Sequence, residues 1–344
     1  MLQLRNESPF RANIAVFPDP TGIETLYVTV RAAFQLAGAD LAVAAEQRPI
    51  QLADEHTGDP ARSSLARAGE VHLLKPGTDV VLLGEAFAPH GRPAASVDVS
   101  LSVGPVAKTV RVFGDRTWIT GASDRISSPE PFVRMPLVYE RAFGGILELD
   151  PDTGVTTLDP RNPAGMGFAR IRGRGAISAR VLPNLEDPAR LVTHPGDRPA
   201  PAGFGFIAPS WAPRRLYAGT YDKAWQRARA PFLPGDFDAR YFHAATPDLI
   251  CKTHLRGGET IEVHNANPSG ALRVRVPRCE IEAAVRIAGV TSRPPLFLET
   301  VLVEPSERLV SLLFRAAVGC DKHTLDVERV EIAVKRLDLG ARAA

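Results

Sequence analysis

Alternation of apolar and polar residues with a period of two is the feature that most constrains how this chain can fold. In the run SVDVSLSVG, residues 96–104, the apolar residues at positions 97, 99, 101 and 103 all fall on one side of an extended chain. The run KTVRVFGDRTW, residues 108–118, repeats this period after the turn-like stretch VGPVAK. Adjacent runs of this kind are typical of an antiparallel sheet that buries one face in a core.

Similar strand-like runs occur in the first and last thirds of the chain and are absent from its middle third. LYVTVRAAFQL (26–36) and DVVLLGEAFA (79–88) precede the middle third. A hairpin at 260–277, with NANPSG as its turn, follows it, and further runs lie at residues 279–289, 295–305, 308–319 and 327–337. These patterns predict a mainly β protein with two antiparallel, β-sandwich-like units, at 1–145 and 257–344. A long, ordered, loop-rich segment at 146–256, with one or two short helices, joins them.

Proline and glycine recur throughout the segment 146–256, and regular periodicity fades there. The stretch TYDKAWQRARA, residues 220–230, predicts a short helix capped by Thr220 or Asp222. Eight of the chain's 23 aromatic residues lie within 211–242: Trp211, Tyr217, Tyr221, Trp225, Phe232, Phe237, Tyr241 and Phe242. Because disordered linkers are poor in aromatic residues, we predict that this segment is ordered.

The composition limits the classes of partner. With 344 residues and a hydrophobic fraction of 44%, the chain can bury a substantial core. A net charge of +2 gives no general reason to expect nucleic acid or an anionic membrane as a partner. The basic run RIRGRGAISAR, residues 170–180, lacks aromatic residues that could stack on bases. We therefore expect neither nucleic acid nor a membrane as a partner.

The sequence also predicts a cytoplasmic protein. It contains no stretch of about 18 uninterrupted apolar residues that could span a bilayer. The first residues, MLQLRNESPFRANIAVF, do not have the basic start, apolar run and cleavage site of a signal peptide. The three cysteines are an odd number and are better explained as reduced thiols than as a disulfide framework.

One turn carries the residue types of an acid–base site. In LADEHTGDPARSSL, residues 52–65, these are Asp54, Glu55, His56, Asp59, Ser63 and Ser64. A hydrolase would use His56 as its base, whereas the alternative is a turn whose polar side chains cap backbone groups. A second candidate pair of carboxylates is Glu140 with Asp236. Since no G-x-S-x-G elbow occurs, we predict no catalytic residues and keep a hydrolase of carbohydrate or peptide as an alternative.

Four residues are donors of the type that zinc prefers: Cys251, His254, His264 and Cys279. The first two have the spacing C-x2-H, but fourteen residues separate the other two, so the second half of a zinc knuckle is missing. Packed or surface side chains explain these residues equally well. We predict no metal and no cofactor.

The motif PLVYERAFGG, residues 136–145, is interpreted as a structural lock. In an extended chain, Tyr139 and Arg141 would face one side and Glu140 the other. Glu140 and Arg141 would then find partners in the loops that follow, and Gly144 with Gly145 would allow a sharp exit of the chain. A lock of this kind needs no substrate.

Several motifs, taken together and in the order in which they occur, resemble those of a known family. They are ADEHTGDPARSSL, KPGTDVVLLGEAFAP, VDVSLSVGPVAKTVRVFGDRTW, MPLVYERAFGG, RNPAGMGF, LPNLEDP, PAGFG and YAGTYDKAW followed by RAPFLPGDFDARYFHAATPDL. Over residues 15 to 280 the chain resembles the bacterial family known as domain of unknown function 2169. The resemblance implies a cytoplasmic adaptor or chaperone of type VI secretion, which binds a secreted effector or its PAAR or spike tip protein and helps to load it. No cofactor, reaction or catalytic residue comes with it.

The aromatic residues of the middle segment are the predicted surface for such a protein partner. We assign partner binding to Tyr217, Tyr221, Trp225, Tyr241 and Phe242, because large flat side chains in proline-held loops bury area at a low entropic cost.

Two alternatives remain for these rings. They could face inward and hold the two β units together, and we expect Phe232 and Phe237 in particular to point inward. They could also form the exposed planar strip of a carbohydrate-binding module. The oligomeric state does not follow from the sequence.

Overall fold

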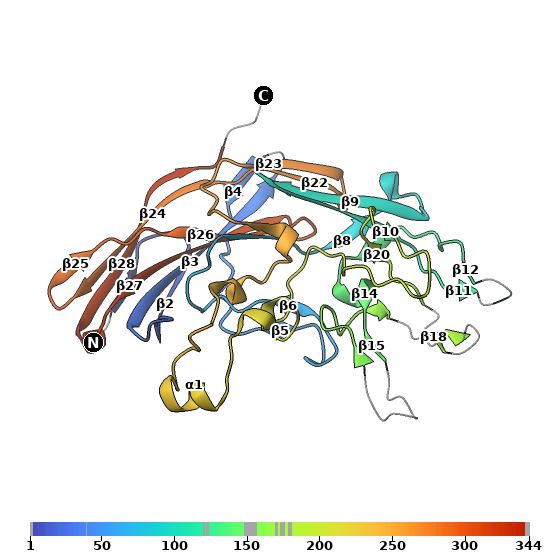
Figure 1. Cartoon of the computed structure of the whole chain (residues 1–344). Helices are drawn as coiled ribbons and strands as arrows, with labels where there is room; N and C mark the ends of the chain where they lie inside the picture. Colours follow the sequence, from blue (N-terminus) through green and yellow to red (C-terminus); the bar gives the residue numbers. More distant parts are fainter. Residues whose placement is uncertain are drawn as a thin grey trace.

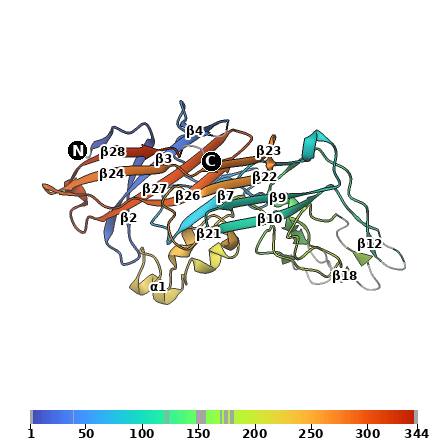
Figure 2. The same cartoon turned by 90° about the horizontal axis from the view of Figure 1, so that it is seen from above.

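The computed structural model describes residues 3–340, except 39, 120, 122–123, 148–156, 169–170, 173–175 and 178–180. Its architecture is mainly β, as the alternation predicts (Figure 1). Within these residues three sheets of four to seven strands contain the long strands. The loop-rich segment lies beside them, with the helix α1 (Lys223–Ala228) at its outer edge (Figures 1 and 2). None of the described helices is long and apolar enough to cross a membrane.

The largest sheet has seven strands among the described residues, drawn from both ends of the chain. They are β2 (Arg11–Pro18), β3 (Glu24–Ala37), β4 (Asp40–Val43), β7 (Thr78–Leu82), β21 (Ile250–Cys251), β26 (Phe297–Glu304) and β27 (Leu309–Gly319). Their order is β2-β3-β27-β26-β7-β21, and β4 pairs with β3. The long ladder between β3 and β27 is antiparallel, whereas β7 and β26 are parallel, as their long crossover connection allows.

A second sheet, of five strands in the described chain, also joins the two ends. Its strands are β9 (Ser96–Val103), β10 (Val106–Phe113), β20 (Leu185–Glu186), β22 (Thr260–Asn267) and β23 (Gly270–Arg275). They lie in the order β20-β10-β9-β22-β23. The alternation predicted for β9 is confirmed, because Val97, Val99, Leu101 and Val103 are all buried. The predicted hairpin forms as β22 and β23.

The remaining described elements are shorter or peripheral. A four-stranded sheet has the order β1-β28-β24-β25, and its strands are β1 (Gln3–Asn6), β24 (Arg278–Ile287), β25 (Val290–Ser292) and β28 (Val327–Asp338). The short strand pairs are β5 (Glu55–His56) with β6 (Leu65–Arg67), β8 (Glu85–Phe87) with β13 (Arg134–Pro136), β11 (Trp118–Ile119) with β12 (Arg125–Ile126), β14 (Phe143–Gly144) with β17 (Met166–Gly167), β15 (Ile146–Leu147) with β16 (Thr157–Leu158), and β18 (Ile171–Arg172) with β19 (Ala176–Ile177). The 3₁₀ helices are η1 (Pro89–Gly91), η2 (Tyr139–Arg141), η3 (Arg214–Tyr217), η4 (Ala239–Phe242), η5 (Pro247–Leu249) and η6 (Thr324–Asp326).

The sheets do not follow the predicted division of the chain. Strands from 1–145 and 257–344 lie side by side in the seven-stranded sheet, and they meet again where β9 pairs with β22. Boundaries at 145 and 256 are therefore not boundaries between sheets. The run predicted as one strand at 79–88 is also divided, because β7 ends at Leu82 and β8 begins at Glu85 in a different sheet.

The loop-rich segment packs into the same core as the sheets. Phe204, Phe206 and Trp211 are buried in one cluster with residues of β7 and β26. Leu82 on β7 donates its backbone N–H to the carbonyl of Phe204 at 3.1 Å, so that the segment is bonded to the sheet. Where it is described, the segment is ordered, and part of its aromatic content faces the core.

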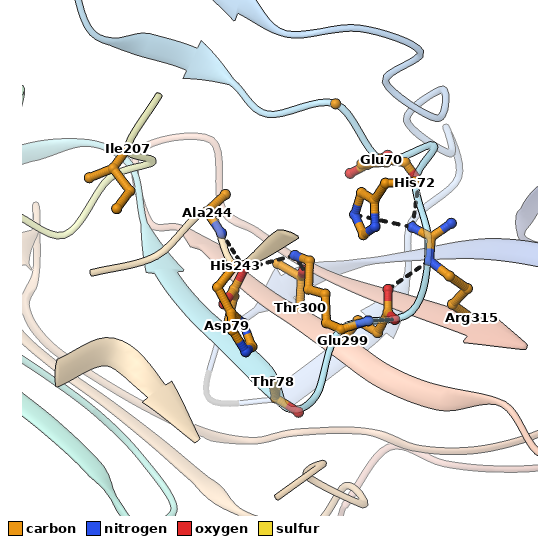
Figure 3. Close-up of polar contacts among 12 residues, drawn as sticks. Glu70, His72, Thr78, Asp79, Ile207, His243, Ala244, Glu299, Thr300 and Arg315 are labelled. Atoms are coloured by element: carbon orange, nitrogen blue, oxygen red, sulfur yellow. Dashed lines mark hydrogen bonds and ion pairs between the residues drawn. The ribbon is translucent and has the colours of Figure 1, made fainter. Parts of the chain in front are cut away.

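A fully buried ion pair lies in the middle of the largest sheet (Figure 3). Arg315 on β27 and Glu299 on β26 are both 0% exposed, and Arg315 Nε donates to Glu299 Oε2 at 2.7 Å. The register of β26 shifts at Glu299, and such a bulge re-aims the side chain of the extra residue. Arg315 also donates to the hydroxyl of Thr29 on β3 at 2.6 Å and to the carbonyl of Glu70 at 2.5 Å. The pair thus connects three strands and the chain that precedes β7.

Replacing Arg315 by Met is expected to lower the free energy of unfolding by about 3–5 kcal/mol, because the carboxylate of Glu299 is left buried without its cation. Urea titration measures the change. The matched control is Arg273→Met, which removes an exposed cross-strand pair with Glu262 and should change the free energy by less than about 1 kcal/mol. Equal effects of the two substitutions would contradict the structural role of the buried pair.

Candidate functional site

The helix α1 begins where the sequence predicts. Asp222 is its N-cap, and the carboxylate accepts a hydrogen bond from the backbone N–H of Trp225 at 2.8 Å. After the helix, the guanidinium of Arg229 donates to the carbonyl of Pro20 at 2.7 Å and to that of Leu233 at 3.0 Å. These bonds fasten α1 to the turn between β2 and β3, so its exposed face is held in place.

The five aromatic residues predicted to bind a partner have different surroundings. Tyr221 is 54% exposed and meets Trp225 edge to face, with ring centroids 4.7 Å apart. Tyr241 and Phe242 are half-buried and pack against each other. Tyr217 lines a cleft next to them. Only part of the predicted set is therefore open to solvent.

The sequence predicts that Phe232 and Phe237 both point inward, and the structure agrees in part for Phe237. Phe237 is half-buried and packs against Tyr241 and Phe242. The prediction that Phe232 points inward is wrong, because this ring is 37% exposed and lies over the surface turn at Gly22. It covers backbone at the periphery and does not fill the core.

A cleft of about 390 Å³ opens within the loop-rich segment, between η3, η4, η5 and β21. Its apolar walls come from Ile207, Pro213, Ala245, Pro247 and Ile250. Its basic side chains are Arg214, Arg240, His243 and Lys252. Among the described residues that line it, none is Ser, Thr, Cys, Asp or Glu. The cleft thus offers basic groups beside apolar surface, with no side-chain nucleophile of the usual hydrolase types.

Arg214 is the buried cation of this cleft. It is 7% exposed, and its Nη1 and Nε donate to the carbonyls of Ile207 at 2.7 Å and Tyr241 at 3.0 Å. The guanidinium lies 5.6 Å from the ring centroid of Tyr241, within the range of a cation–π contact. Burial lowers the pKa of Arg214, and no carboxylate among the described residues lies within ion-pair distance of it. Its direct contacts are carbonyl dipoles and an aromatic face, while Asp54 and Asp79 favour its charge from beyond ion-pair distance.

His243 connects the cleft to the buried charges of the largest sheet (Figure 3). Its Nδ1 donates to Asp79 Oδ1 at 2.6 Å, since a carboxylate only accepts. The other oxygen of Asp79 accepts from Lys75 Nζ at 2.7 Å and from the backbone N–H of Ala244 at 2.9 Å. Lys75 Nζ also donates to the hydroxyl of Thr300 at 3.1 Å. The Nε2 of His243 has no hydrogen-bond partner among the described residues, and His243 lines the cleft.

Asp79 remains ionised in spite of its burial. Burial alone raises the pKa of a carboxyl group, but the charge of Lys75 and the hydrogen bonds from His243 and Lys75 outweigh it. The net result is a pKa of Asp79 well below its usual range. Asp79 and Lys75 therefore form a buried ion pair that fixes the position of His243 in the lining of the cleft.

Phe242 is held in place by stacking on the ring of His72. Burial, with the charges of Arg315 and Lys75, holds the pKa of His72 well below its usual range, so the ring is neutral. Nδ1 donates to the carbonyl of Leu73 at 2.5 Å, and Nε2 accepts from Arg315 at 3.4 Å. Phe242 stacks on this ring with centroids 5.2 Å apart, which ties η4 to the buried charges.

The polar turn at 52–65 uses its side chains to bond the backbone. Asp54 accepts from the N–H of Gly69 at 2.7 Å, and Ser63 donates to the carbonyl of Asp59 at 2.8 Å. These bonds correspond to the capping alternative. Asp236, from the other candidate carboxylate pair, accepts two hydrogen bonds from Thr220, at 2.9 and 2.7 Å.

Glu140 anchors this turn to η2. It accepts from the N–H and hydroxyl of Ser64 at 2.8 and 2.7 Å, and from the hydroxyl of Thr57 at 2.8 Å. Burial opposes ionisation, yet these bonds lower the pKa of Glu140 overall. The prediction that its partners follow it in the chain is wrong, because Thr57 and Ser64 precede it; residues 139–141 form a 3₁₀ turn rather than an extended strand. Arg141 does bond to a following loop, through Asn184 at 2.9 Å.

Tyr139 and the two glycines complete this region. Tyr139 is buried and meets Trp211 edge to face at 5.7 Å. Gly144 and Gly145 have φ values of 148° and 118°, which favour glycine, and Gly145 N–H donates to the carbonyl of Asn162 at 2.8 Å. Asn162 in turn donates to the carbonyl of Tyr139 at 2.8 Å. The motif at 136–145 thus bonds to segments on both sides of it in sequence.

The other candidate groups are separate from the cleft. Cys251 and His254 contact Thr253 and the carbonyl of Lys75, while Cys279 contacts a backbone carbonyl next to it. Among the described residues, no group of three or more His, Cys, Asp or Glu is arranged to hold a metal. The basic run at 170–180 lies mostly outside the described residues.

Sequence reasoning missed Arg214, His243 and the Lys75–Asp79 pair. For the other buried pair the sequence does contain a signal, namely a single charged residue inside each of two apolar runs: Glu299 in LFLETVLV and Arg315 in LLFRAAV. Opposite charges in two such runs predict a buried pair. No comparable signal joins Asp79 to His243, which are 164 residues apart.

Comparison with protein-family models adds one finding. The model described as "Uncharacterized protein conserved in bacteria (DUF2169)" matches residues 21–315. The chain belongs to this family. The matched range contains the cleft and the largest sheet except for β2 and the end of β27, and the family's description names no activity. No curated protein and no solved structure matches the chain.

Replacing Gly203 by Ala is expected to destabilise the protein by about 1–3 kcal/mol, because a methyl group there would lie 2.7 Å from the ring of Tyr139 in a filled core. Thermal and urea unfolding measure the effect. Gly235→Ala is the matched control, since an added Cβ at Gly235 meets no described atom within 4 Å. Equal stability of the two variants would show that Tyr139 does not constrain this region.

Asp79→Asn is expected to change how stability depends on pH. Because the pKa of Asp79 is depressed in the folded state, its stabilising contribution is present above the unfolded value of 3.8 and is lost as the pH falls further. Between about pH 5 and pH 3, urea unfolding should therefore show a smaller loss of stability in the variant than in the wild type. Asp321→Asn, at an exposed turn, should keep the wild-type dependence. A wild-type dependence in Asp79→Asn would contradict the buried ion pair of Asp79 and Lys75.

Proposed function

We propose that this protein is a cytoplasmic, non-enzymatic adaptor or chaperone. It binds a type VI secretion effector, or the PAAR or spike protein that carries it, and helps to load it for export. The assignment to type VI secretion is supported by the resemblance of the sequence motifs to the family known as domain of unknown function 2169. The observation that carries a binding role is a set of large apolar side chains held in solvent by an ordered, hydrogen-bonded segment.

Three such side chains come from one stretch of the loop-rich segment. Leu216 is 70% exposed, Tyr221 is more than half exposed, and Phe232 also reaches solvent. The stretch that bears them is fixed by the cap of α1 and by the bonds of Arg229 to Pro20 and Leu233. Exposed apolar groups on a fixed frame favour association, because little conformational entropy is lost on binding.

The same region gives less support to the alternatives. The carboxylates considered for a hydrolase accept hydrogen bonds from nearby backbone or hydroxyl groups. The rings of Tyr221 and Trp225 meet at 67°, and those of Tyr241 and Phe242 at 80°. A carbohydrate-binding strip requires rings that lie in one plane, so these pairs suit a protein partner better.

The test is co-purification of the tagged chain with the product of a neighbouring gene that encodes an effector or a PAAR or spike protein. The double substitution Leu216→Ala with Tyr221→Ala is expected to weaken the complex at least about tenfold, because both side chains would be buried by the partner. The matched control is Val290→Ala with Leu325→Ala, two exposed apolar residues on other elements.

Thermal unfolding of each variant checks that the fold is retained. An unchanged complex in the first variant, or equal weakening in both, would place the interface elsewhere. A chain that binds none of these secretion proteins would contradict the proposed function itself.

A further inference from the structure

The cleft of the loop-rich segment combines an apolar wall with two cations, Arg214 and Lys252, that form no ion pair within the described chain. We propose that it binds a carboxylate side chain of the protein partner, presented by a short peptide segment with apolar residues beside the acidic one. This inference rests on the proposed function and specifies the chemistry that the partner supplies.

The size and lining of the cleft suit a few side chains. Its volume of about 390 Å³ is at the lower end of the range for ligand sites, roughly 300–1,000 Å³. The walls from Ile207, Pro213, Ala245, Pro247 and Ile250 would contact aliphatic or aromatic groups. Prolines also keep the walls stiff, because their backbone φ is fixed. A ligand that fits must therefore be apolar over most of its surface.

Arg214 supplies the main reason to expect an anion. The side chain is more than nine-tenths buried, and its two bonded nitrogens reach only backbone carbonyls. Its remaining nitrogen, Nη2, has no hydrogen-bond partner within the described chain. Asp54 and Asp79 favour the charge of Arg214 only from beyond ion-pair distance, so a carboxylate that enters the cleft and bonds to Nη2 would compensate this buried cation directly.

The rim adds charge of the same sign. Lys252 is exposed and has no partner among the described residues. Arg240 is already paired with Asp238 at 2.6 Å, and it lies over the ring of Tyr217 at 4.4 Å. Two cations that form no ion pair within the described chain, Arg214 and Lys252, therefore border the cleft, and its described lining includes no acidic residue. This arrangement is complementary to a carboxylate and repels basic peptides.

A peptide is the occupant that the surroundings favour. Tyr217 lines the cleft, while its neighbour Leu216 is among the exposed residues assigned to the proposed interface. A partner seated on Leu216 and Tyr221 would thus reach the cleft without leaving the same stretch of surface. The occupant and the proposed interface form one continuous binding region.

The experiment selects binders of the purified, full-length protein from a displayed library of random heptapeptides. A fluorescein-labelled copy of the most enriched peptide is then titrated against the wild type and its variants. We expect enriched peptides to share an Asp or Glu beside apolar residues. Lys252→Glu should weaken binding about tenfold, as should replacement of the peptide's acidic residue by its amide.

Arg215→Glu is the matched control. This exposed arginine belongs to η3, the 3₁₀ helix that also contains Arg214, but it does not line the cleft. Lys252→Glu and the replacement of the peptide's acidic residue by its amide should not have additive effects on the binding free energy, since each removes the same contact. Lys252→Arg should retain binding. The exposed position of Lys252 keeps the test valid even if substitutions of the buried Arg214 prevent folding.

The inference is overturned if selection yields no peptide, if the enriched peptides lack an acidic residue, or if Lys252→Glu and Arg215→Glu behave alike. This result can be separated from failure of the proposed function. A secretion protein that still binds through Leu216 and Tyr221 would leave the adaptor role intact without the cleft. Acidic peptides that bind while no secretion protein does would support the cleft alone.

Discussion

The buried ion pair of Arg315 and Glu299 is the interaction on which the rest of the structure depends. It joins β26 to β27, and the other donors of Arg315 reach Thr29 on β3 and the carbonyl of Glu70. Glu299 uses its second oxygen to accept from the backbone N–H of Lys75 at 2.7 Å. A shift of one residue would turn either charge to the opposite face of the sheet, where it would lack its partner. The pair therefore sets how strands from the two ends of the chain align.

Lys75 extends this constraint to the loop-rich segment. Its ammonium group bonds to Asp79, which in turn holds His243 and the backbone of Ala244. A segment without long strands needs such bonds, because its buried polar groups have no ladder partners. As a consequence, His243 has a fixed position in the lining of the cleft, and the exposed side chains near α1 are presented from a body connected to the core. This fixed frame is the physical reason why we propose a binding role for a segment so poor in regular structure.

Much of the fold could be predicted, since regular strands and caps depend on neighbouring residues. The alternation of β9, the hairpin of β22 and β23, and the cap at Asp222 are of this kind. The sharing of sheets between the two ends of the chain could not be predicted, because the pairing of β3 with β27 depends on which faces meet in space. The exposure of Phe232 was missed for the same reason: hydrophobic character alone does not say which surface a ring covers.

By itself, the amino-acid sequence determined the local elements, the mainly β character and the ordered state of the described part of the proline-rich middle segment. Only the tertiary structure decided that Asp79 meets His243, that Glu140 anchors a turn that precedes it, and that Arg214 and Lys252 border one cleft. Periodicity and capping act over a few residues and are therefore written in consecutive positions. Ion pairs and clefts arise from distances between segments that only the folded chain brings together.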